Sequence, residues 1–574
     1  MRIRALRAVI IFIFSLLVIG LFYTQIVNYH FYKKLSENNR IRVLPLAARR
    51  GRIYDHKARL LANSRISFDV QVIFREMTEK DTTIKALAKV LEINPNTLSE
   101  KIKKASLRPF VPVKVAEDIP RHKAINIEEM KFDLPGVIVT TSPVRNYLYG
   151  ETFSHIIGYL GEINEDELVR YKTYGYHMQD FVGKDGVERE YNDYLRGVDG
   201  GLQVEVDSKG RQLRNIAMKE PTPGKDLYLS VDLDLQKFCS SLLEGQKGAI
   251  LAMNPETGDL LALVSHPSFD PNMFTVPDNS KEIYGLLKSS DYPMLNRAIS
   301  GTYPPGSVFK VVVAAAALDA GEFEEHKTFF CNGSYNVGNR VFHCWKEEGH
   351  GEETILNAIK DSCNVFFYQL GLTIGVDQIA KYAFLFGLGR RTGIDLPGEA
   401  LGVVPTTSWK KKQFNKPWYK GETANYSIGQ GYLLVTPIQI LRLYGILANG
   451  GGLVQPFVVA RIEDVKLSHG GSGKIDISKS AIDTIREALK SVVNAKHGTG
   501  FYAKSNEIII SGKTGTAQNP AGKSHAWFAC FAPFDNPQIC VVVFIEQGEK
   551  GGLKPASFAK KIIEKAKALE LIQT

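Results

Sequence analysis

The sequence predicts an α+β protein with one N-terminal transmembrane helix, an elongated α+β region, and a C-terminal antiparallel sheet flanked by helices, with an all-helical subdomain inserted. Three observations predict this fold: an uncharged apolar run near the N-terminus, a middle region that mixes strand-like and helical runs, and strand-like runs at both ends of the C-terminal part. The 574 residues are 44% hydrophobic and 23% charged, which excludes a disordered or fibrous chain and indicates more than one domain.

The apolar run at residues 8–27 predicts one membrane crossing. No Asp, Glu, Lys or Arg lies between Arg7 and Lys33, and a helix of about 20 residues spans about 30 Å of hydrocarbon. The arginines within residues 1–7 predict, by the positive-inside rule, a cytoplasmic tail with the rest of the chain outside. No small-residue cleavage site follows the run, so we expect a retained signal anchor rather than a removed signal peptide.

Charge and cysteine content narrow the function classes. The net charge is +10, from 71 Lys and Arg against 61 Asp and Glu, and no basic block concentrates it. This balance favours an anionic surface such as a membrane or polymer over nucleic acid. Six cysteines are too few for a disulfide scaffold at this length.

Two bodies are expected beyond the anchor. The first mixes strand-like runs such as 68–74 with charged helical stretches such as 82–91 and holds no concentrated chemistry. In the second, residues 249–253 and 260–264 form an expected hairpin. Strand-like runs at 508–510, 526–531 and 539–545 and a helix over about 557–571 close the chain around the helix-rich insertion at 305–500. The predicted limits are 1–7 for the tail, 8–27 for the anchor, 28–238 for the α+β region and 239–574 for the C-terminal domain.

Ser307 and Lys310 form the first candidate catalytic pair. They precede the wholly apolar run 311–317, which predicts a buried helix. Lys310 lies one turn from Ser307 on the same face, and its charged form is disfavoured near the positive end of a buried helix. Lys310 is therefore a candidate general base for the Ser307 hydroxyl, although Ser-x-x-Lys alone also fits a capping serine before an exposed lysine.

Two more short motifs support this pair. Ser362-Cys363-Asn364 precedes an apolar helical run, and Lys513-Thr514-Gly515-Thr516 follows the expected strand at 508–510. Each alone also fits a helix cap or a turn. A P-loop is excluded because its first glycine would fall at Glu507, and no zincin or α/β-hydrolase motif occurs.

The three motifs, in this order, resemble those of class B penicillin-binding proteins, and the chain looks closest to the penicillin-binding protein 2 family of the rod-shape system. Further strings that resemble this family stand at 50–55, 183–188, 395–399, 416–419, 428–432 and 436–439. Two departures lie outside the motifs. Residues 56–59 replace the usual Arg-Asn-Gly turn, and Leu148 stands where family members often have proline.

The resemblance implies a pedestal at 28–238, a transpeptidase domain at 239–574, and peptidoglycan D,D-transpeptidation during cell elongation. Ser307, with Lys310 as base, would attack a D-Ala-D-Ala carbonyl of a stem peptide, and an amine from a second stem would resolve the acyl-enzyme. The resemblance implies that Ser362 relays a proton and that Asn364 holds Lys310 and the substrate amide. It implies that Lys513, Thr514 and Thr516, in the motif that includes Gly515, bind the substrate carboxylate. The backbone N–H groups of Ser307 and Thr516 would stabilise the oxyanion. β-Lactams should acylate Ser307.

The resemblance also implies a setting: a single-pass protein of the inner membrane whose catalytic domain is periplasmic. Its partners would be a polytopic glycosyltransferase of the shape, elongation, division and sporulation (SEDS) family and the rod-complex protein that contacts the pedestal, with no nucleic acid. Acyl transfer would need no cofactor. A D,D-carboxypeptidase and a non-catalytic β-lactam sensor or scaffold stay open as alternatives. A class A β-lactamase is disfavoured because no Glu-x-x-x-Asn occurs between Asn364 and Lys513.

Three cysteines and a histidine form a candidate zinc site. Cys331, Cys344, His350 and Cys363 lie in a polar, glycine-bearing stretch that leads into the Ser362 motif. Three thiolates and an imidazole suit tetrahedral zinc, whereas the spacing also fits a Cys331–Cys344 disulfide or buried free thiols. The resemblance adds that some family members hold zinc with Asp, Asp, His and Cys at the matching places. Four protein ligands predict a structural zinc that fixes the start of the helix after Cys363.

Overall fold

The computed structural model describes residues 2–33, 41–105, 112–171, 175–176, 180–206, 212–276, 279–471, 473–519 and 522–573. The chain forms two compact units, here called the anchor unit and the catalytic unit. The anchor unit comprises Met1–Gly51, Ser64–Val144 and Arg196–Lys225, and the catalytic unit comprises Arg52–Asn63, Arg145–Leu195 and Asp226–Thr574. Both units mix helices and strands, which confirms the predicted α+β class. The predicted domain limits, 28–238 and 239–574, stay a prediction.

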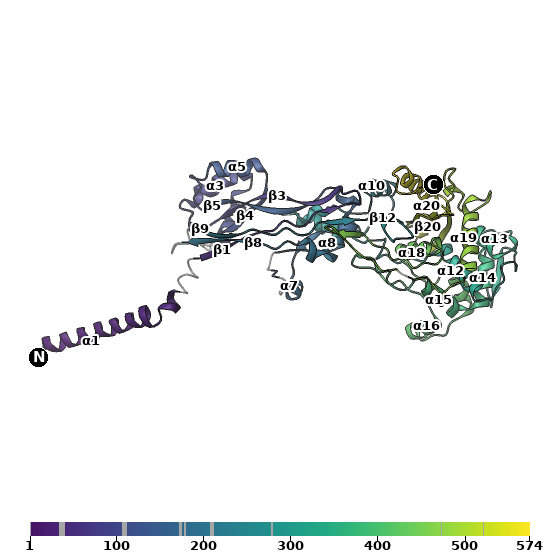
Figure 1. Cartoon of the computed structure of the whole chain (residues 1–574), viewed down its shortest axis with the longest axis horizontal. Helices are drawn as coiled ribbons and strands as arrows, with labels where there is room; N and C mark the ends of the chain where they lie inside the picture. Colours follow the sequence, from purple (N-terminus) through teal and green to yellow (C-terminus); the bar gives the residue numbers. More distant parts are fainter. Residues whose placement is uncertain are drawn as a thin grey trace. The chain divides into compact units, whose positions relative to one another are not determined.

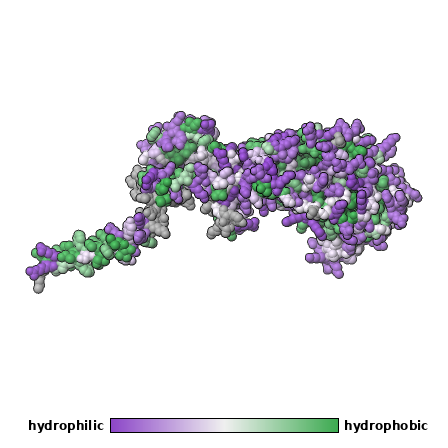
Figure 2. All heavy atoms as spheres, viewed as in Figure 1, coloured by the Kyte–Doolittle hydropathy of each residue, from purple (hydrophilic) through white to green (hydrophobic). Residues whose placement is uncertain are grey.

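The chain begins with the long apolar helix α1 (Arg2–Phe22), which continues into a short π-helix (Tyr23–Val27). Within Ile3–Val27, an 18-residue stretch has a mean hydropathy of 2.7, and none of that stretch is buried. Figure 2 shows an almost continuous hydrophobic surface along α1, with hydrophilic residues at its N-terminal end. Among the described residues it is the one helix long and apolar enough to cross a membrane, as predicted.

Among the described residues, the rest of the anchor unit contains two groups of paired strands and three helices. Strands β1 (Ile41–Leu46), β8 (Gly200–Val206) and β9 (Gln212–Lys219) form an antiparallel sheet in that order. Strand β3 (Leu60–Val72) pairs with β4 (Val113–Ile119) and β5 (Val137–Tyr147), and the helices are α3 (Lys80–Leu91), α4 (Pro95–Ala105) and α5 (Arg121–Glu129). Val70, Leu87, Leu98 and Ile127 lie in the core that joins these helices to the β3 sheet.

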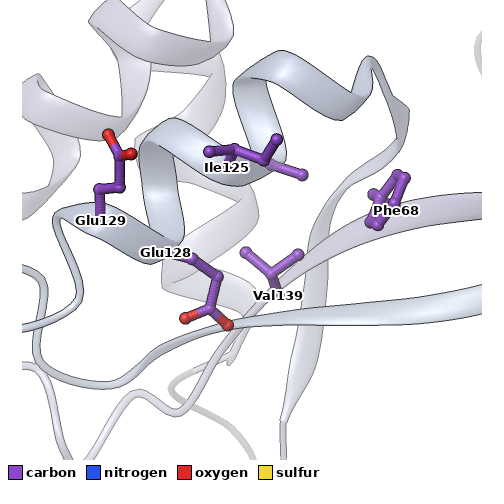
Figure 3. Close-up of a pocket in the computed structure, with 6 residues that line it drawn as sticks. Phe68, Ile125, Glu128, Glu129 and Val139 are labelled. Atoms are coloured by element: carbon purple, nitrogen blue, oxygen red, sulfur yellow. The ribbon is translucent and has the colours of Figure 1, made fainter.

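A shallow apolar hollow of about 360 Å³ lies between α5 and the strands β3 and β5. Ile125 and Glu128 extend from α5 over Val139 and Phe68 (Figure 3). Ile125 is 48% exposed, so an apolar side chain is open to solvent at this place.

A five-stranded antiparallel sheet forms the centre of the catalytic unit (Figure 1). Its order is β12 (Leu260–His266), β11 (Gly248–Met253), β21 (Ile539–Ile545), β20 (Gly522–Ala532) and β19 (Ser511–Asn519). Gly248 pairs with both His266 and Ile545, which confirms the predicted hairpin and the predicted sharing of one sheet by the two ends of the domain. Helices α10 (Leu233–Leu242) and α20 (Lys554–Ala568) cover one face, and α12 (Lys310–Asp319) and α18 (Pro437–Ala448) cover the other.

The predicted strand at 508–510 is wrong. The ladder of β19 with β20 begins at the pair Ser511 and Phe531, and residues 508–510 have no strand partner. Ile508 and Ile510 are apolar because they enter the core on the α20 face, not because they lie in a strand. Lys513 therefore lies inside a strand and not in a turn after one.

Helices from α12 to α19 lie between β12 and β19, as the predicted helix-rich insertion requires, but the short strands β13 to β18 lie there too, so the insertion is not all-helical. The further strands are β2 (Ile53–Tyr54), β6 (Leu160–Glu162), β7 (Phe181–Gly183), β10 (Leu227–Leu229), β13 (Phe329–Cys331), β14 (Ser334–Val337), β15 (Arg340–His343), β16 (Gly351–Glu353), β17 (Val459–Ile462) and β18 (Val465–Lys466). The further helices are α6 (Ser154–Ile157), α7 (Glu165–Tyr171), α8 (Gly186–Glu190), α9 (Asn192–Leu195), α11 (Ser280–Lys288), α13 (Ile355–Lys360), α14 (Asn364–Ile374), α15 (Val376–Leu385), α16 (Thr407–Phe414), α17 (Lys420–Ser427) and α19 (Lys479–Asn494).

Candidate active site

Ser307 lies in a single 3-10 turn (Gly306–Phe309) directly before helix α12. Residues 310–317 of α12 have no exposed surface, which confirms the predicted buried helix. Ser307 itself is half-buried and reaches solvent. The Tyr444 hydroxyl donates to the Val308 carbonyl at 3.2 Å and so fixes the turn from the side of α18.

Two glycines allow β19 to approach this turn closely. A Cβ at Gly515 would lie 2.9 Å from the Pro305 carbonyl oxygen, which is closer than side-chain carbons come in practice. Gly306 has a φ of +58°, and a Cβ there would lie 2.6 Å from the carbonyl oxygen of Thr516. The backbone of Thr516 therefore lies next to the turn that carries Ser307, as a shared oxyanion site requires.

Lys310 connects this turn to the Ser362 motif. Its fully buried ammonium donates to the Ser362 carbonyl and to Asn364 Oδ1, both at 2.8 Å, and lies 3.4 Å from Ser362 Oγ. Burial lowers the pKa of Lys310 from 10.5 to about 8. A lysine with this pKa can hold and release a proton near neutral pH.

The backbone at Ser362 is strained. Its φ of +53° lies in the left-handed region, which serine rarely adopts. The next residue, Cys363, is the N-cap of α14, so the turn changes direction just before the helix begins. Such conformations persist where the surroundings hold them, and they are common at functional sites.

Lys513 completes the set of charged groups. It is fully buried in β19, and its ammonium donates to the Thr514 carbonyl at 3.2 Å. Burial lowers the pKa of Lys513 well below its ordinary value, and the nearby charge of Lys310 acts in the same direction. A substrate carboxylate would relieve the cost of this buried positive charge.

The structure thus brings all three sequence motifs to one place in the catalytic unit. The motif residues are Ser307, Lys310, Ser362, Asn364, Lys513, Thr514, Gly515 and Thr516. Sequence reasoning missed Tyr444 and Thr499. The Thr499 hydroxyl donates to the Lys360 carbonyl at 3.2 Å and lies 3.4 Å from Thr514 Oγ1. Neither residue stands in a recognisable motif, so only the folded chain reveals them.

The four predicted zinc ligands also come together. The ligand atoms of Cys331, Cys344, His350 and Cys363 all lie within 4.8 Å of one another. His350 Nδ1 lies 3.6 Å from the sulfur of Cys331 and 3.5 Å from that of Cys344. With Zn–S near 2.3 Å and Zn–N near 2.1 Å, a tetrahedral zinc needs ligand atoms about 3.6 Å apart. All six cysteines are free, so the structure has no Cys331–Cys344 disulfide.

Backbone N–H groups support the sulfur atoms. The N–H of Asn364 donates to Cys344 Sγ and that of Phe366 donates to Cys363 Sγ, both at 3.4 Å. The hydrogen bond from Cys363 lowers the pKa of the Cys344 thiol, and His350 adds to this effect. The same bond raises the pKa of Cys363. The cluster therefore has the donor types and spacing of a structural zinc site.

Comparison with known protein families agrees with the geometry. Residues 248–564 match the family described as "Penicillin binding protein transpeptidase domain". Residues 45–229 match the family described as "Penicillin-binding Protein dimerisation domain".

Individual relatives extend this similarity over nearly the whole chain. The chain is 36% identical over 567 residues to the peptidoglycan D,D-transpeptidase MrdA of Acinetobacter baumannii, covering 94% of this chain and 84% of the relative. Among solved structures, the complex between penicillin-binding protein 2 and MreC from Helicobacter pylori matches with a TM-score of 0.82 at 31% identity, covering 93% of this chain and all of that one. A structure titled "Structural coordination of polymerization and crosslinking by a peptidoglycan synthase complex" matches with a TM-score of 0.74 at 30% identity. The match covers 98% of this chain and 97% of that one.

Proposed function

Because the chain belongs to the penicillin-binding protein 2 family of peptidoglycan D,D-transpeptidases, we propose that it cross-links stem peptides through an acyl-enzyme on Ser307. The observation that carries this proposal is the single hydrogen-bonded group formed by Lys310, Ser362 and Asn364 directly behind the Ser307 turn. A buried lysine beside a half-exposed serine is the arrangement that a Ser-Lys nucleophile needs.

Lys310 acts as the general base in this proposal. With a pKa of about 8, about a tenth of Lys310 is neutral at pH 7, against well under a thousandth at its ordinary pKa of 10.5. The neutral amine takes the Ser307 proton while the serine oxygen attacks the carbonyl between the two terminal D-alanines. Asn364, which accepts a hydrogen bond from Lys310, keeps the amine in place.

The other motif residues handle the developing charges. The backbone N–H groups of Ser307 and Thr516 stabilise the oxyanion, which is worth about 3–4 kcal/mol for each donor in comparable sites. Ser362 passes a proton to the leaving D-alanine amine. Lys513, with the hydroxyls of Thr514 and Thr516, binds the carboxylate of the substrate. An amine of a neighbouring stem then attacks the Ser307 ester and releases the enzyme.

Covalent labelling tests the nucleophile. Ser307→Ala removes one oxygen atom from a half-buried position, so the fold should survive while labelling by a fluorescent penicillin falls to background. Ser300→Ala is a matched control, because it removes a hydroxyl seven positions before Ser307 that donates to the Gly398 carbonyl and, within the described part of the chain, has no hydrogen bond to a motif residue. Labelling that survives in Ser307→Ala would show that another residue is acylated.

We also infer that Cys331, Cys344, His350 and Cys363 hold a structural zinc ion. Support comes from donor atoms spaced as a tetrahedral ion requires and from two backbone N–H groups that donate to sulfur. Zinc would supply no reactive group, because four protein ligands leave no position for water. Its effect would be to hold the strained turn at Ser362 through the neighbouring Cys363.

The membrane orientation and the partners follow from the family. We propose that residues 1–7 are cytoplasmic, that α1 is a single-pass inner-membrane anchor and that the catalytic unit is periplasmic. A relative is known in complex with MreC, and another structure is described as a peptidoglycan synthase complex. We therefore propose a rod-complex protein of the MreC kind and a membrane-embedded SEDS glycosyltransferase as partners.

The apolar hollow on α5 is a candidate contact for the rod-complex protein, because it exposes Ile125 beside Phe68 and Val139. Co-purification of this chain with that protein would test the contact. Ile125→Glu should weaken the complex, and Val169→Glu, at a more exposed apolar position of the catalytic unit, is the control.

A further inference from the structure

Trp345 is an exposed aromatic residue held beside the Ser362 motif. Its side chain is 57% exposed, yet its indole Nε1–H donates to the Asp361 carbonyl at 3.0 Å. Its ring also meets the His350 ring edge-on, with the two centroids 5.3 Å apart. A large apolar ring that is fixed at two places and open elsewhere is well suited to contact a ligand.

The bond to Asp361 places the indole next to the proton-relay end of the active site. Asp361 directly precedes Ser362, whose Oγ lies 3.4 Å from the ammonium of Lys310. The main chain before Ser362 is held from a second direction, because Thr499 donates to the Lys360 carbonyl. Trp345 thus contacts the main chain beside Ser362, although it lies in none of the three motifs.

The chemistry of the reaction indicates what should meet this ring. In the proposed mechanism, on which this inference rests, one amine leaves the substrate carbonyl and a second amine attacks the same carbon. Attack is the reverse of departure, so the entering amine takes the position that the leaving amine held, next to Ser362. The part of the acceptor that carries this amine must then extend past the residues bordering Ser362 on the solvent side.

We propose that Trp345 binds the amine-bearing side chain of the acceptor stem peptide, with the indole face against its aliphatic carbons and its ammonium group. An aromatic face attracts an alkyl ammonium and also buries methylene groups. After the acceptor ammonium loses one proton to solvent, its nitrogen forms the new amide bond and the Ser307 ester C–O bond breaks. The second amine proton passes to the Ser307 oxygen through Ser362 and Lys310. Trp345 would therefore favour an amine over water as the acceptor.

Partitioning of the acyl-enzyme tests the proposal in the full-length protein. A thioester analogue of the D-Ala-D-Ala end supplies the acyl group, and a stem tetrapeptide with meso-diaminopimelate is the acceptor probe. The measured quantity is the acceptor concentration at which aminolysis equals hydrolysis. The variants are Trp345→Ala and Trp345→Leu. The leucine variant keeps an apolar side chain against His350 and replaces the alanine variant if that one fails to fold. Tyr284→Ala, which removes an exposed ring from α11 of the same unit, is the control.

Loss of the indole should raise this acceptor concentration about three- to thirtyfold, which is the range expected for one cation–aromatic contact. Penicillin acylation, acyl-enzyme hydrolysis and metal content should stay within twofold of the unmodified protein, and Tyr284→Ala should change nothing. Unchanged partitioning would overturn the proposal. An equal loss of acylation and aminolysis would also overturn it, because Trp345 would then only hold the Ser362 turn. If the unmodified protein is not acylated at all, the proposed function itself fails.

Discussion

At the scale of single residues, Lys310 decides whether the nucleophile is activated. Replacement by Arg keeps a positive charge but removes a group able to give up its proton, since guanidinium stays protonated. Penicillin acylation of Lys310→Arg should fall about 100- to 10,000-fold, the usual contribution of a general base. Stopped-flow measurement of acylation at pH 7.5 checks this. A rate near that of the unmodified protein would mean that another base serves Ser307.

The pH dependence of acylation follows from the same residue. The neutral amine is the active form, and it predominates above the pKa of about 8 that burial gives Lys310. Below pH 8, the acylation rate should therefore rise about tenfold for each unit by which the pH increases. Above pH 8 the rate should level off. A rate that is constant from pH 6 to pH 9 would contradict Lys310 as the base. Circular dichroism over the same range controls for unfolding.

Ala58 gives a residue-scale test of stability. It has a φ of +59° in the tight turn where the Asp55 N–H donates to the Arg59 carbonyl at 2.9 Å. The left-handed region costs alanine about 1–2 kcal/mol, whereas glycine loses about 0.5–1 kcal/mol more backbone entropy on folding. Ala58→Gly should therefore stabilise the catalytic unit by about 0.5–1 kcal/mol. A lower melting temperature than that of the unmodified protein would contradict the assigned strain.

At the scale of elements, the Cys/His cluster should stabilise the start of α14. Cys344→Ser removes one sulfur ligand, so zinc measured by elemental analysis should fall from about one per chain to well below it. The melting temperature should fall too, and penicillin acylation should slow because Cys363 adjoins Ser362. Cys239→Ser is the matched control, because Cys239 is buried in α10 outside the cluster. A metal-free protein with Cys331 and Cys344 disulfide-linked would overturn the zinc proposal.

Secondary structure was predicted correctly where a segment's own side-chain pattern matches the elements that it packs against. The helical run 311–317 and the hairpin strands 249–253 and 260–264 are apolar throughout; the helix is buried and the two strands pair, as predicted. The edge strand β19 was misplaced because its residues are mostly small or polar. They form a strand because β20 supplies a ladder and because glycine lets β19 pack on the Ser307 turn. Such a strand is set by its neighbours, so its own sequence carries little signal.

The candidate site likewise contains residues that the sequence predicts and residues that only the fold reveals. Short motifs identified the residues that carry charge and hydroxyl groups, since these types recur at fixed local spacing. Tyr444, Thr499 and Trp345 each donate to a main-chain carbonyl that is 16 to 139 positions away along the chain. At the scale of the whole molecule, residues 52–63 and 145–195 pack with 226–574, although nothing in their composition relates them to that part. Non-local packing of this kind is fixed only by the complete fold.

The anchor helix gives the last prediction, which concerns the whole chain. The described residues of α1 are exposed along their length, so removing the helix takes no apolar contact from the core of either unit. A chain lacking residues 2–33 should therefore fold and bind a fluorescent penicillin at a rate within twofold of the full chain. Expressed in cells with a cleavable export signal in place of residues 2–33, it should move from the membrane fraction to the soluble periplasmic fraction. A second variant, in which an unrelated single-pass helix replaces residues 2–33, controls for attachment alone. Continued sedimentation of the shortened chain with membranes would contradict α1 as the anchor, and loss of penicillin binding would contradict its independence from the catalytic unit.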